Sequence, residues 1–386
     1  MKLAILMLVG TTSLLAPLTA SADSGRAYEW GIKVAQGGPG SVPTIVQSFD
    51  AELIDAGNIA DVAVLSDGSV WTWGTTHIGS TSMTAVQVPG VSNVRKRPVD
   101  GNGDFAALEQ PGTDLACPSS STVVTWGLSE SGDLGLGVIN NGANYASAQD
   151  VTALDCQHVV QLAAANSHMI ALTRNGDVYV WGGNANATLG LGYTHRKSSI
   201  DTPTLNAAAT ALTGGNSAGV EITAGVGDGG LLVDGQAYSW GDNTYGQCGC
   251  DSTATTILSP TAVDQRGVLL SWIDQGGNTG ADGHELALTA GGTVYAWGDD
   301  AEGQLGQGDV ADSSLPELVS GLPTIVDVRA GGMHSLALDA SGNVWAWGVY
   351  RQIGNGTKTD ALTPVEVLRG VSMISAGALH SLAETA

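Results

Sequence analysis

Four of the seven histidines in the chain stand at the same point of a repeated pattern, directly before a short apolar run. Examples are HSLAL (334–338) and HELAL (284–288). Aligned on that run, three further repeats carry aspartate at this position. The seven aligned residues are Asp61, Asp104, His168, Asp228, His284, His334 and His380. Because imidazole and carboxylate together suit divalent metals, this ring is a candidate site for a metal or another ligand.

A second interpretation of the ring is structural. Each side chain would form a hydrogen bond within its turn and so join neighbouring repeats. A ring of seven is wide, and few of its members could share one ion. We therefore favour the structural role and predict no bound metal or other cofactor.

The phrase DGNGD (100–104) resembles the start of a calcium-binding loop, since Asp100, Asn102 and Asp104 alternate. Phe105 occupies the sixth position, where such loops need glycine, and Pro111 occupies the twelfth, where they need glutamate. We interpret the phrase as a polar turn. GVGDGG (225–230) matches a dinucleotide fingerprint, but a hairpin pattern follows it instead of the required helix. No paired carboxylates, and no nucleophile with an identifiable base, emerge, so an enzyme is not expected.

The elements that must position these residues are short strands. A phrase that ends in Trp-Gly recurs at spacings of 43 to 59 residues. Its seven occurrences are AYEWG (27–31), VWTWG (70–74), VVTWG (123–127), VYVWG (178–182), AYSWG (237–241), VYAWG (294–298) and VWAWG (344–348). Most are preceded by an alternating run and a glycine turn, which predicts a hairpin, and are followed by a glycine-rich loop and a further strand.

VYAWGDDAEGQLGQG (294–308), with AGGMHSLAL (330–338) upstream of the next phrase, resembles the regulator of chromosome condensation repeat. The resemblance covers the chain after its first residues and weakens early, where THIGS (76–80) replaces the Gly-Gln-Leu-Gly phrase. It implies an all-β, seven-bladed β-propeller with four-stranded antiparallel blades, which agrees with the count of Trp-Gly phrases.

The two ends of the chain read as one split repeat. HSLAETA (380–386) followed by DSGRAYEWG (23–31) resembles the internal HELALTAGGTVYAWG (284–298). We therefore expect the C-terminal and N-terminal strands to share one blade and close the ring, which leaves no unpaired seam.

The turns before the seven ring positions and the loops after Trp-Gly are expected on one face, which we call the loop face; the other is the opposite face. Tyr193, Tyr245 and Tyr350 fall in these loops and are candidate interface anchors.

The four cysteines suit an oxidising compartment. Cys117 lies in an expanded hairpin and Cys156 before the next repeat, both at the opposite face, so a disulfide between them is predicted. Cys248 and Cys250 replace apolar residues in GQCGC (246–250); they could bridge locally, or Cys248 could fill a leucine position of the core.

The first residues predict export. MK is followed by LAILMLVG and by a small-residue site ending at Ala22, which is typical of a signal peptide. We expect residues 1–22 to be removed after Ala22, residues 23–386 to form the propeller, and the product to be secreted or periplasmic. No later stretch is long and apolar enough to span a membrane.

The charge balance limits the partners. The chain has 14 Lys and Arg against 37 Asp and Glu, a net charge of −23, which argues against nucleic acid and anionic membranes. Its only basic cluster, RKR (95–97), is expected to be solvated strand surface.

The resemblance implies a rigid scaffold whose face loops bind another macromolecule. The founding member of the family acts on a small nuclear GTPase and on chromatin, which an export signal argues against. An exported branch that inhibits β-lactamases offers a precedent for secreted protein binding. We therefore predict a secreted, non-enzymatic propeller that binds a protein through its face loops, with the oligomeric state open. The alternative is a carbohydrate-binding module, or a hydrolytic or lyase enzyme, that uses the loop face or channel mouth.

Overall fold

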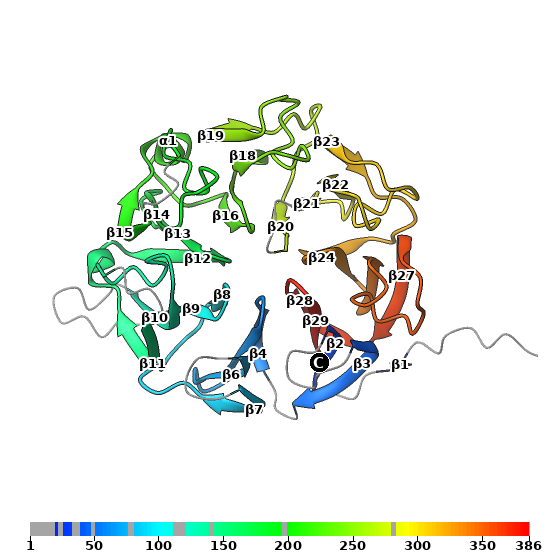
Figure 1. Cartoon of the computed structure of the whole chain (residues 1–386), viewed down its shortest axis with the longest axis horizontal. Helices are drawn as coiled ribbons and strands as arrows, with labels where there is room; N and C mark the ends of the chain where they lie inside the picture. The colour runs from blue at the N-terminus through cyan, green and yellow to red at the C-terminus, as the bar shows by residue number, and fades with distance from the viewer. Residues whose placement is uncertain are drawn as a thin grey trace, which may run out of the picture.

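The computed structural model describes residues 20–21, 26–32, 39–47, 51–75, 81–110, 121–138, 143–194, 199–278 and 283–385. Seven sheets are arranged in a ring about a central axis, as Figure 1 shows. The predicted all-β, seven-bladed propeller is confirmed. Every blade contains four antiparallel strands, and in six blades these strands follow one another along the chain.

Blades 1 to 3 follow one another along the chain. Blade 1 contains β4 (Ala51–Ala56), β5 (Ala60–Leu65), β6 (Val70–Thr75) and β7 (Thr81–Gln87). Blade 2 contains β8 (Val99–Asp100), β9 (Asp104–Glu109), β10 (Thr122–Ser129) and β11 (Ala143–Asp150), and η1 (Thr152–Leu154) follows it. Blade 3 contains β12 (Val159–Ala165), β13 (His168–Thr173), β14 (Val178–Gly182) and β15 (Ile200–Leu205), followed by α1 (Ala207–Leu212).

Blades 4 to 6 repeat the pattern. Blade 4 contains β16 (Val220–Ala224), β17 (Asp228–Val233), β18 (Gln236–Asp242) and β19 (Thr256–Ala262). Blade 5 contains β20 (Trp272–Gln275), β21 (His284–Leu288), β22 (Val294–Gly298) and β23 (Ser313–Leu318). Blade 6 contains β24 (Ile325–Ala330), β25 (His334–Asp339), β26 (Asn343–Gly348) and β27 (Ala361–Arg369).

Blade 7 is the split blade. Its inner strands, β28 (Val371–Ala376) and β29 (His380–Thr385), come from the C-terminal end, and its outer strands, β2 (Ala27–Ile32) and β3 (Pro39–Gln47), come from the N-terminal end. β2 pairs with β29 in a register that sets Gly31 opposite His380. The predicted closure of the ring by the two ends of the chain is confirmed.

A short strand, β1 (Ala20–Ser21), lies parallel to the end of β27, with Ala20 opposite Leu368. It falls within the predicted signal peptide, most of which lies outside the described residues, so the leader and its cleavage stay predictions. In the described part of the chain, no helix is long and apolar enough to cross a bilayer.

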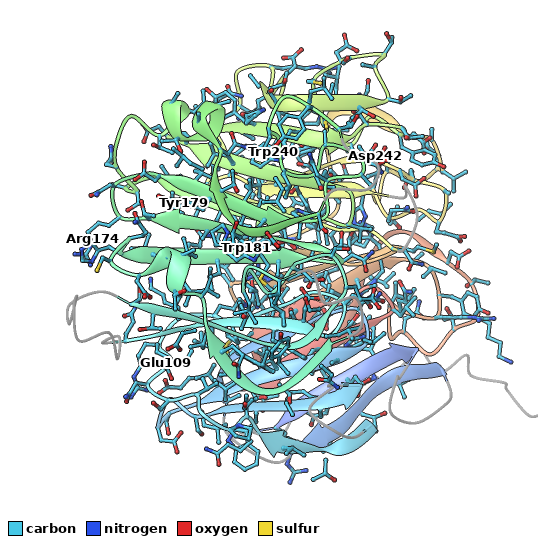
Figure 2. All side chains as sticks on the ribbon, turned by 60° about the vertical axis from the view of Figure 1, so that its left-hand side comes forward. Glu109, Arg174, Tyr179, Trp181, Trp240 and Asp242 are labelled. Atoms are coloured by element: carbon cyan, nitrogen blue, oxygen red, sulfur yellow. The ribbon has the colours of Figure 1, made fainter. Side chains whose placement is uncertain are left out.

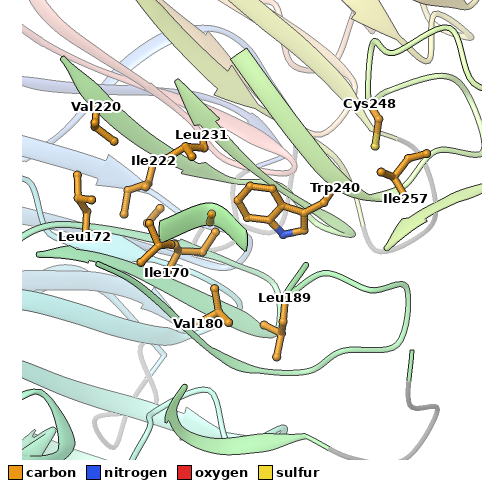
Figure 3. Close-up of a cluster of buried hydrophobic side chains, with 13 residues drawn as sticks. Ile170, Leu172, Val180, Leu189, Val220, Ile222, Leu231, Trp240, Cys248 and Ile257 are labelled. Atoms are coloured by element: carbon orange, nitrogen blue, oxygen red, sulfur yellow. The ribbon is translucent and has the colours of Figure 1, made fainter. Parts of the chain in front are cut away.

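The core lies between adjacent blades. Alternate strand residues of one blade meet those of the next, because side chains of a strand point to both sides of its sheet. Figure 3 shows one such layer, in which Ile170 and Val180 of blade 3 face Ile222 and Trp240 of blade 4. All seven tryptophans of the Trp-Gly phrases are fully buried in such layers.

Four of the glycine-rich loops that the structure describes hold the tryptophan of the following blade. Trp181, Trp240, Trp297 and Trp347 each donate an indole hydrogen bond to a loop carbonyl of the preceding blade, at 2.7, 2.9, 2.9 and 2.8 Å. The loops after Trp-Gly are therefore held by the core beneath them. Figure 2 shows the ring more nearly from the side, with Arg174 of the opposite face and Asp242 of the loop face toward different ends.

Two of the cysteine predictions can be compared with the structure. Cys248 and Cys250 are free thiols. Cys248 is fully buried in the layer between blades 3 and 4, which agrees with its filling a leucine position. Cys117 lies outside the described residues, so its pairing with Cys156 stays a prediction.

Candidate functional site

Six of the seven predicted ring positions have the same register. Asp104, His168, Asp228, His284, His334 and His380 each lie opposite the glycine of a Trp-Gly pair. In blade 1 that place belongs to Ala60, opposite Gly74, and Asp61 lies opposite Trp73. The alignment of Asp61 with the others was therefore wrong by one residue. Because strand side chains alternate, Asp61 faces the other side of its sheet.

Three of the histidines reach across to the next blade. His284 Nε2 lies 2.9 Å from Ser335 Oγ, and His334 Nε2 lies 2.7 Å from Ser381 Oγ. Both serines lie opposite the tryptophan of their blade and donate in turn to a loop carbonyl, Ser335 to that of Gln304 at 2.7 Å. Each contact thus connects a turn, the next blade and a face loop.

The third contact explains the shifted aspartate. His380 Nε2 lies 2.7 Å from Asp61 Oδ1, and both side chains are almost completely buried. Asp61 occupies in blade 1 the register that Ser335 and Ser381 occupy in blades 6 and 7. The contact from histidine to the next blade is the same in all three cases. Where blade 7 meets blade 1, a carboxylate takes the place of the hydroxyl.

Burial sets the charge of these histidines. It lowers the pKa of His284 and of His334 to about 3, and that of His168 to about 4, so all three are neutral at pH 7. Burial also acts to lower the pKa of His380, but the adjacent Asp61 carboxylate outweighs it and the pKa of His380 is raised. The ring therefore contains one buried ion pair, at the junction of the two chain ends.

The acidic residues of the ring, and the neighbouring Glu285, are also buried away from water. Burial raises the pKa of Asp104 and of Asp228 well above the usual range, and the pKa of Glu285, opposite Trp297, rises to about 8 for the same reason. Glu285 accepts hydrogen bonds from Ser239 at 3.1 Å and from Gln275 at 2.9 Å. These carboxyl groups are held largely in the protonated, neutral form.

The arrangement does not form a metal centre. Among the residues that the structure describes, no group of three His, Cys, Asp or Glu side chains is placed to hold a metal ion. Asn102, in the DGNGD turn between β8 and β9, accepts from Asn58 at 2.9 Å and donates its backbone N–H to Asp104 at 2.7 Å. All seven predicted ring residues are at most 3% exposed. Two cavities lie in the central channel between the blades, and none of the seven is among the described residues that line them. For Asp61, His284, His334 and His380, this geometry favours the joining of blades over contact with an external ligand.

The loop face carries the candidate anchors. Tyr193 is 42% exposed, and Tyr245 and Tyr350 are half-buried, with Arg351 donating to the Tyr350 hydroxyl at 2.8 Å. Exposed acidic residues lie in the same loops: Glu130, Asp251, Asp309, Asp312 and Asp360. Arg351 and Lys358 are the exposed basic residues of these loops in the described part of the chain. Among the loop residues that the structure describes, exposed acidic side chains thus outnumber exposed basic ones.

The central channel holds a second polar site that the sequence did not predict. A cavity of about 470 Å³ runs between the inner strands, from the strand starts at the opposite face to their ends, where a smaller cavity of about 80 Å³ forms the loop-face mouth. Arg97 lines the larger cavity and donates to the carbonyls of Ile54 and Ile374, each at 2.9 Å. The expectation that RKR (95–97) is solvated surface was wrong for Arg97, because the chain enters the innermost strand β8 two residues later.

Arginines and carboxylates alternate around this channel. Arg97 lies 3.7 Å from Asp55, and Arg329 lies 3.0 Å from Asp327 and 3.9 Å from Asp274. Burial raises the pKa of Asp274 to about 6, although Arg329 acts to lower it. The two arginines thus connect inner strands of different blades through backbone carbonyls and carboxylates.

Known proteins share this architecture. A model of the RCC1-like domain matches residues 29–383. The chain is 28% identical over 349 residues to the ultraviolet-B receptor UVR8 of Arabidopsis thaliana, which covers 86% of this chain and 74% of UVR8. It is 30% identical to the human E3 ubiquitin-protein ligase HERC2 over 94% of this chain, but spans only 8% of HERC2. The solved structure of Prp20p from Saccharomyces cerevisiae superimposes with a TM-score of 0.75 at 19% identity, covering 94% of this chain and 92% of Prp20p. The chain belongs to the RCC1-like domain family.

Proposed function

We propose that this protein is an exported, non-enzymatic scaffold that binds a protein partner with a basic surface through its loop face. The observation that supports this proposal is how the loops of that face are held in place and which side chains they expose. Four of its loops are hydrogen-bonded to the buried tryptophans beneath them, and the described loop tips present Tyr193 and a set of exposed acidic side chains.

Preorganised loops favour binding, because little conformational entropy is lost when the partner docks. In two of these loops a further contact fixes the backbone: Asp300 accepts from the Leu305 N–H at 2.7 Å, and Asn243 accepts from the Cys248 N–H at 3.0 Å. A large tyrosine beside carboxylates offers apolar contact area together with attraction for a basic partner.

The relatives support protein binding in general terms. The solved Prp20p structure is described together with binding properties to Gsp1p and histones. This likeness supports a scaffold and does not identify the partner. The ligase activity named for HERC2 belongs to a protein of which this chain matches a small part.

The proposal is tested by recovery of partners from the native culture medium with three immobilised proteins. The first is the wild type, and the second carries Tyr193→Ala and Asp309→Lys on the loop face. The third is a control, Leu269→Ser, at a side chain that is 72% exposed between β19 and β20 on the opposite face. We expect one protein to be recovered by the wild type and the control, and to be lost about tenfold or more by the loop-face variant. Equal recovery by all three, or loss only in the control, would contradict loop-face binding.

A further inference from the structure

At one level of the central channel, two blades carry a polar residue where the other five carry alanine. On the innermost strand of each blade, one residue pairs with the second-strand residue that lies opposite the tryptophan of the Trp-Gly phrase. In five blades this residue is alanine: Ala56, Ala164, Ala224, Ala330 and Ala376. In blades 2 and 5 it is Asp100 and Gln275. All seven residues line both channel cavities, so this level is the junction between them.

The two exceptions carry polar atoms that the protein itself does not satisfy. Asp100 and Gln275 are each only 6% exposed. Both carboxyl oxygens of Asp100, and the carbonyl oxygen of Gln275, are buried without a hydrogen-bond partner. The Gln275 amide nitrogen donates to Glu285, which fixes the side chain in place. Because buried polar groups are normally paired, two unpaired groups within an otherwise alanine level point to a ligand.

A buried donor lines the same cavity. Trp272, at the start of β20, has a buried indole N–H without a partner. The Arg329 guanidinium lies 5.0 Å from the centroid of the Trp272 ring, which holds the ring in position. Trp272 and Gln275 are three residues apart on β20, so their side chains leave opposite sides of this innermost strand, and both line the cavity. The channel lining thus includes one unpaired donor and several unpaired acceptors.

The charges that line the cavity indicate a neutral ligand. Lys96, Arg97 and Arg329 are basic, and Asp55, Asp274 and Glu221 are acidic. Burial, and then the nearby Asp55 charge, raise the pKa of Asp100 well above its usual range, which favours the neutral carboxyl group, and that form can donate as well as accept. The arginines are already occupied by backbone carbonyls and carboxylates. An ionic ligand would therefore meet no unbalanced charge.

We propose that the channel binds a neutral polyhydroxylated molecule, a mono- or disaccharide, whose hydroxyl groups pair with Asp100, Gln275 and Trp272. A cavity of about 470 Å³ has room for such a ligand. Hydroxyl groups both donate and accept, which matches the mixture of unpaired atoms. The site opens through the channel and is independent of partner binding by the loop face.

Two variants of the full chain and one control test the site. Asp100→Ala introduces the residue that five blades already carry, and Trp272→Phe removes the indole N–H while keeping an aromatic ring. The control is Trp345→Phe, which removes an indole N–H that donates to Asp339 at 3.1 Å and does not line the two cavities that the structure describes in the channel. Thermal melts establish that each variant is folded.

Binding is measured by saturation-transfer NMR and calorimetry with glucose, galactose, mannose, maltose, cellobiose, lactose and trehalose, and with glucosamine and glucuronate as charged analogues. We expect saturable binding of at least one neutral sugar, weakened about tenfold or more by each channel variant and unchanged by the control. The site is refuted if no neutral sugar saturates, if the charged analogues bind as tightly, or if the three variants bind alike.

Discussion

At the scale of single residues, neighbouring blades are joined through two adjacent positions of the second strand. The residue opposite the Trp-Gly glycine reaches out from one blade, and the residue opposite the tryptophan receives it in the next, as His334 does with Ser381. Where blade 7 meets blade 1, the receiver is the carboxylate of Asp61 in blade 1. We infer that this stronger, charge-assisted contact compensates for the absence of a covalent link between β29 and β2.

This ion pair gives the junction a distinct pH dependence. The pKa of His380 is raised in the folded protein, so its stabilising contribution is complete below the unfolded value, near 6.5, and is lost as the pH rises through the folded pKa. Asp61→Ala should therefore lower the free energy of unfolding most at pH 6, by about 3–5 kcal/mol, and less at pH 9.

Ser335→Ala is the matched control, because it removes the receiver of the neutral His284. It should cost about 1–3 kcal/mol with little change between pH 6 and pH 9. Denaturant unfolding at both pH values measures the two differences. The same pH dependence in both variants would show that His380 and Asp61 are not an ion pair.

The location of Asp61 also shows what could not be predicted from the sequence at this scale. Its repeat reads IADVAVL (59–65) without a histidine, so either Ala60 or Asp61 could be aligned with the other members. Only the pairing of strands decides, and a shift of one residue moves the side chain to the other face of the sheet.

At the scale of elements, the recurring unit is a face loop anchored to the tryptophan of the next blade. Gly306 has φ +72°, and a Cβ at this position would lie 2.8 Å from Trp347 Nε1. Glycine is therefore needed twice over, for the left-handed backbone and for close approach to the indole that donates to Gln304.

Gly306→Ala should accordingly lower stability by about 2–4 kcal/mol, the sum of backbone strain and overpacking. Gly321→Ala provides the control, because Gly321 also has a positive φ of +84°, but a Cβ added there would meet nothing within 4 Å. It should cost about 1–2 kcal/mol. Thermal melts of both variants measure the difference, and equal costs would mean that the loop is not fixed by the tryptophan.

The elements themselves were accessible from the sequence, since six of the Trp-Gly phrases, with the alternating run before each, mark a pair of consecutive antiparallel strands that the structure contains. The channel was less accessible. Inner strands are short, and β8 has only two residues, so no periodicity indicates that Arg97 or Asp100 faces the channel. One signal was available in the sequence. The residue before the turn that follows each innermost strand is mostly alanine, as in AGG (330–332) and AGA (376–378), but in blade 5 it is glutamine, in QGG (275–277).

At the scale of the whole molecule, the two ends of the chain complete one sheet. Trp30 of β2 is fully buried against blade 6, where a Cβ on Gly354 would lie 2.6 Å from its ring. β2 pairs with both β29 and β3, so its loss would separate the inner half of the blade from the outer half. The arrangement of the loops on one face, and hence the proposed interface, depends on this closure.

The most direct test of the account is the thermal unfolding of two deletion variants in reductant, compared with the chain from residue 23. The first lacks residues 23–31, which removes Trp30 and most of β2. Burial of one large aromatic contributes about 2–3 kcal/mol and each strand hydrogen bond about 1 kcal/mol, against a typical total of about 5–15 kcal/mol. The control lacks residues 112–120, between β9 and β10, and keeps every pair of β2 with β29. We predict that the first variant melts at least about 10 °C lower or shows no cooperative transition, whereas the control stays within a few degrees of the parent. Equal melting temperatures for the two deletions would contradict the closed ring.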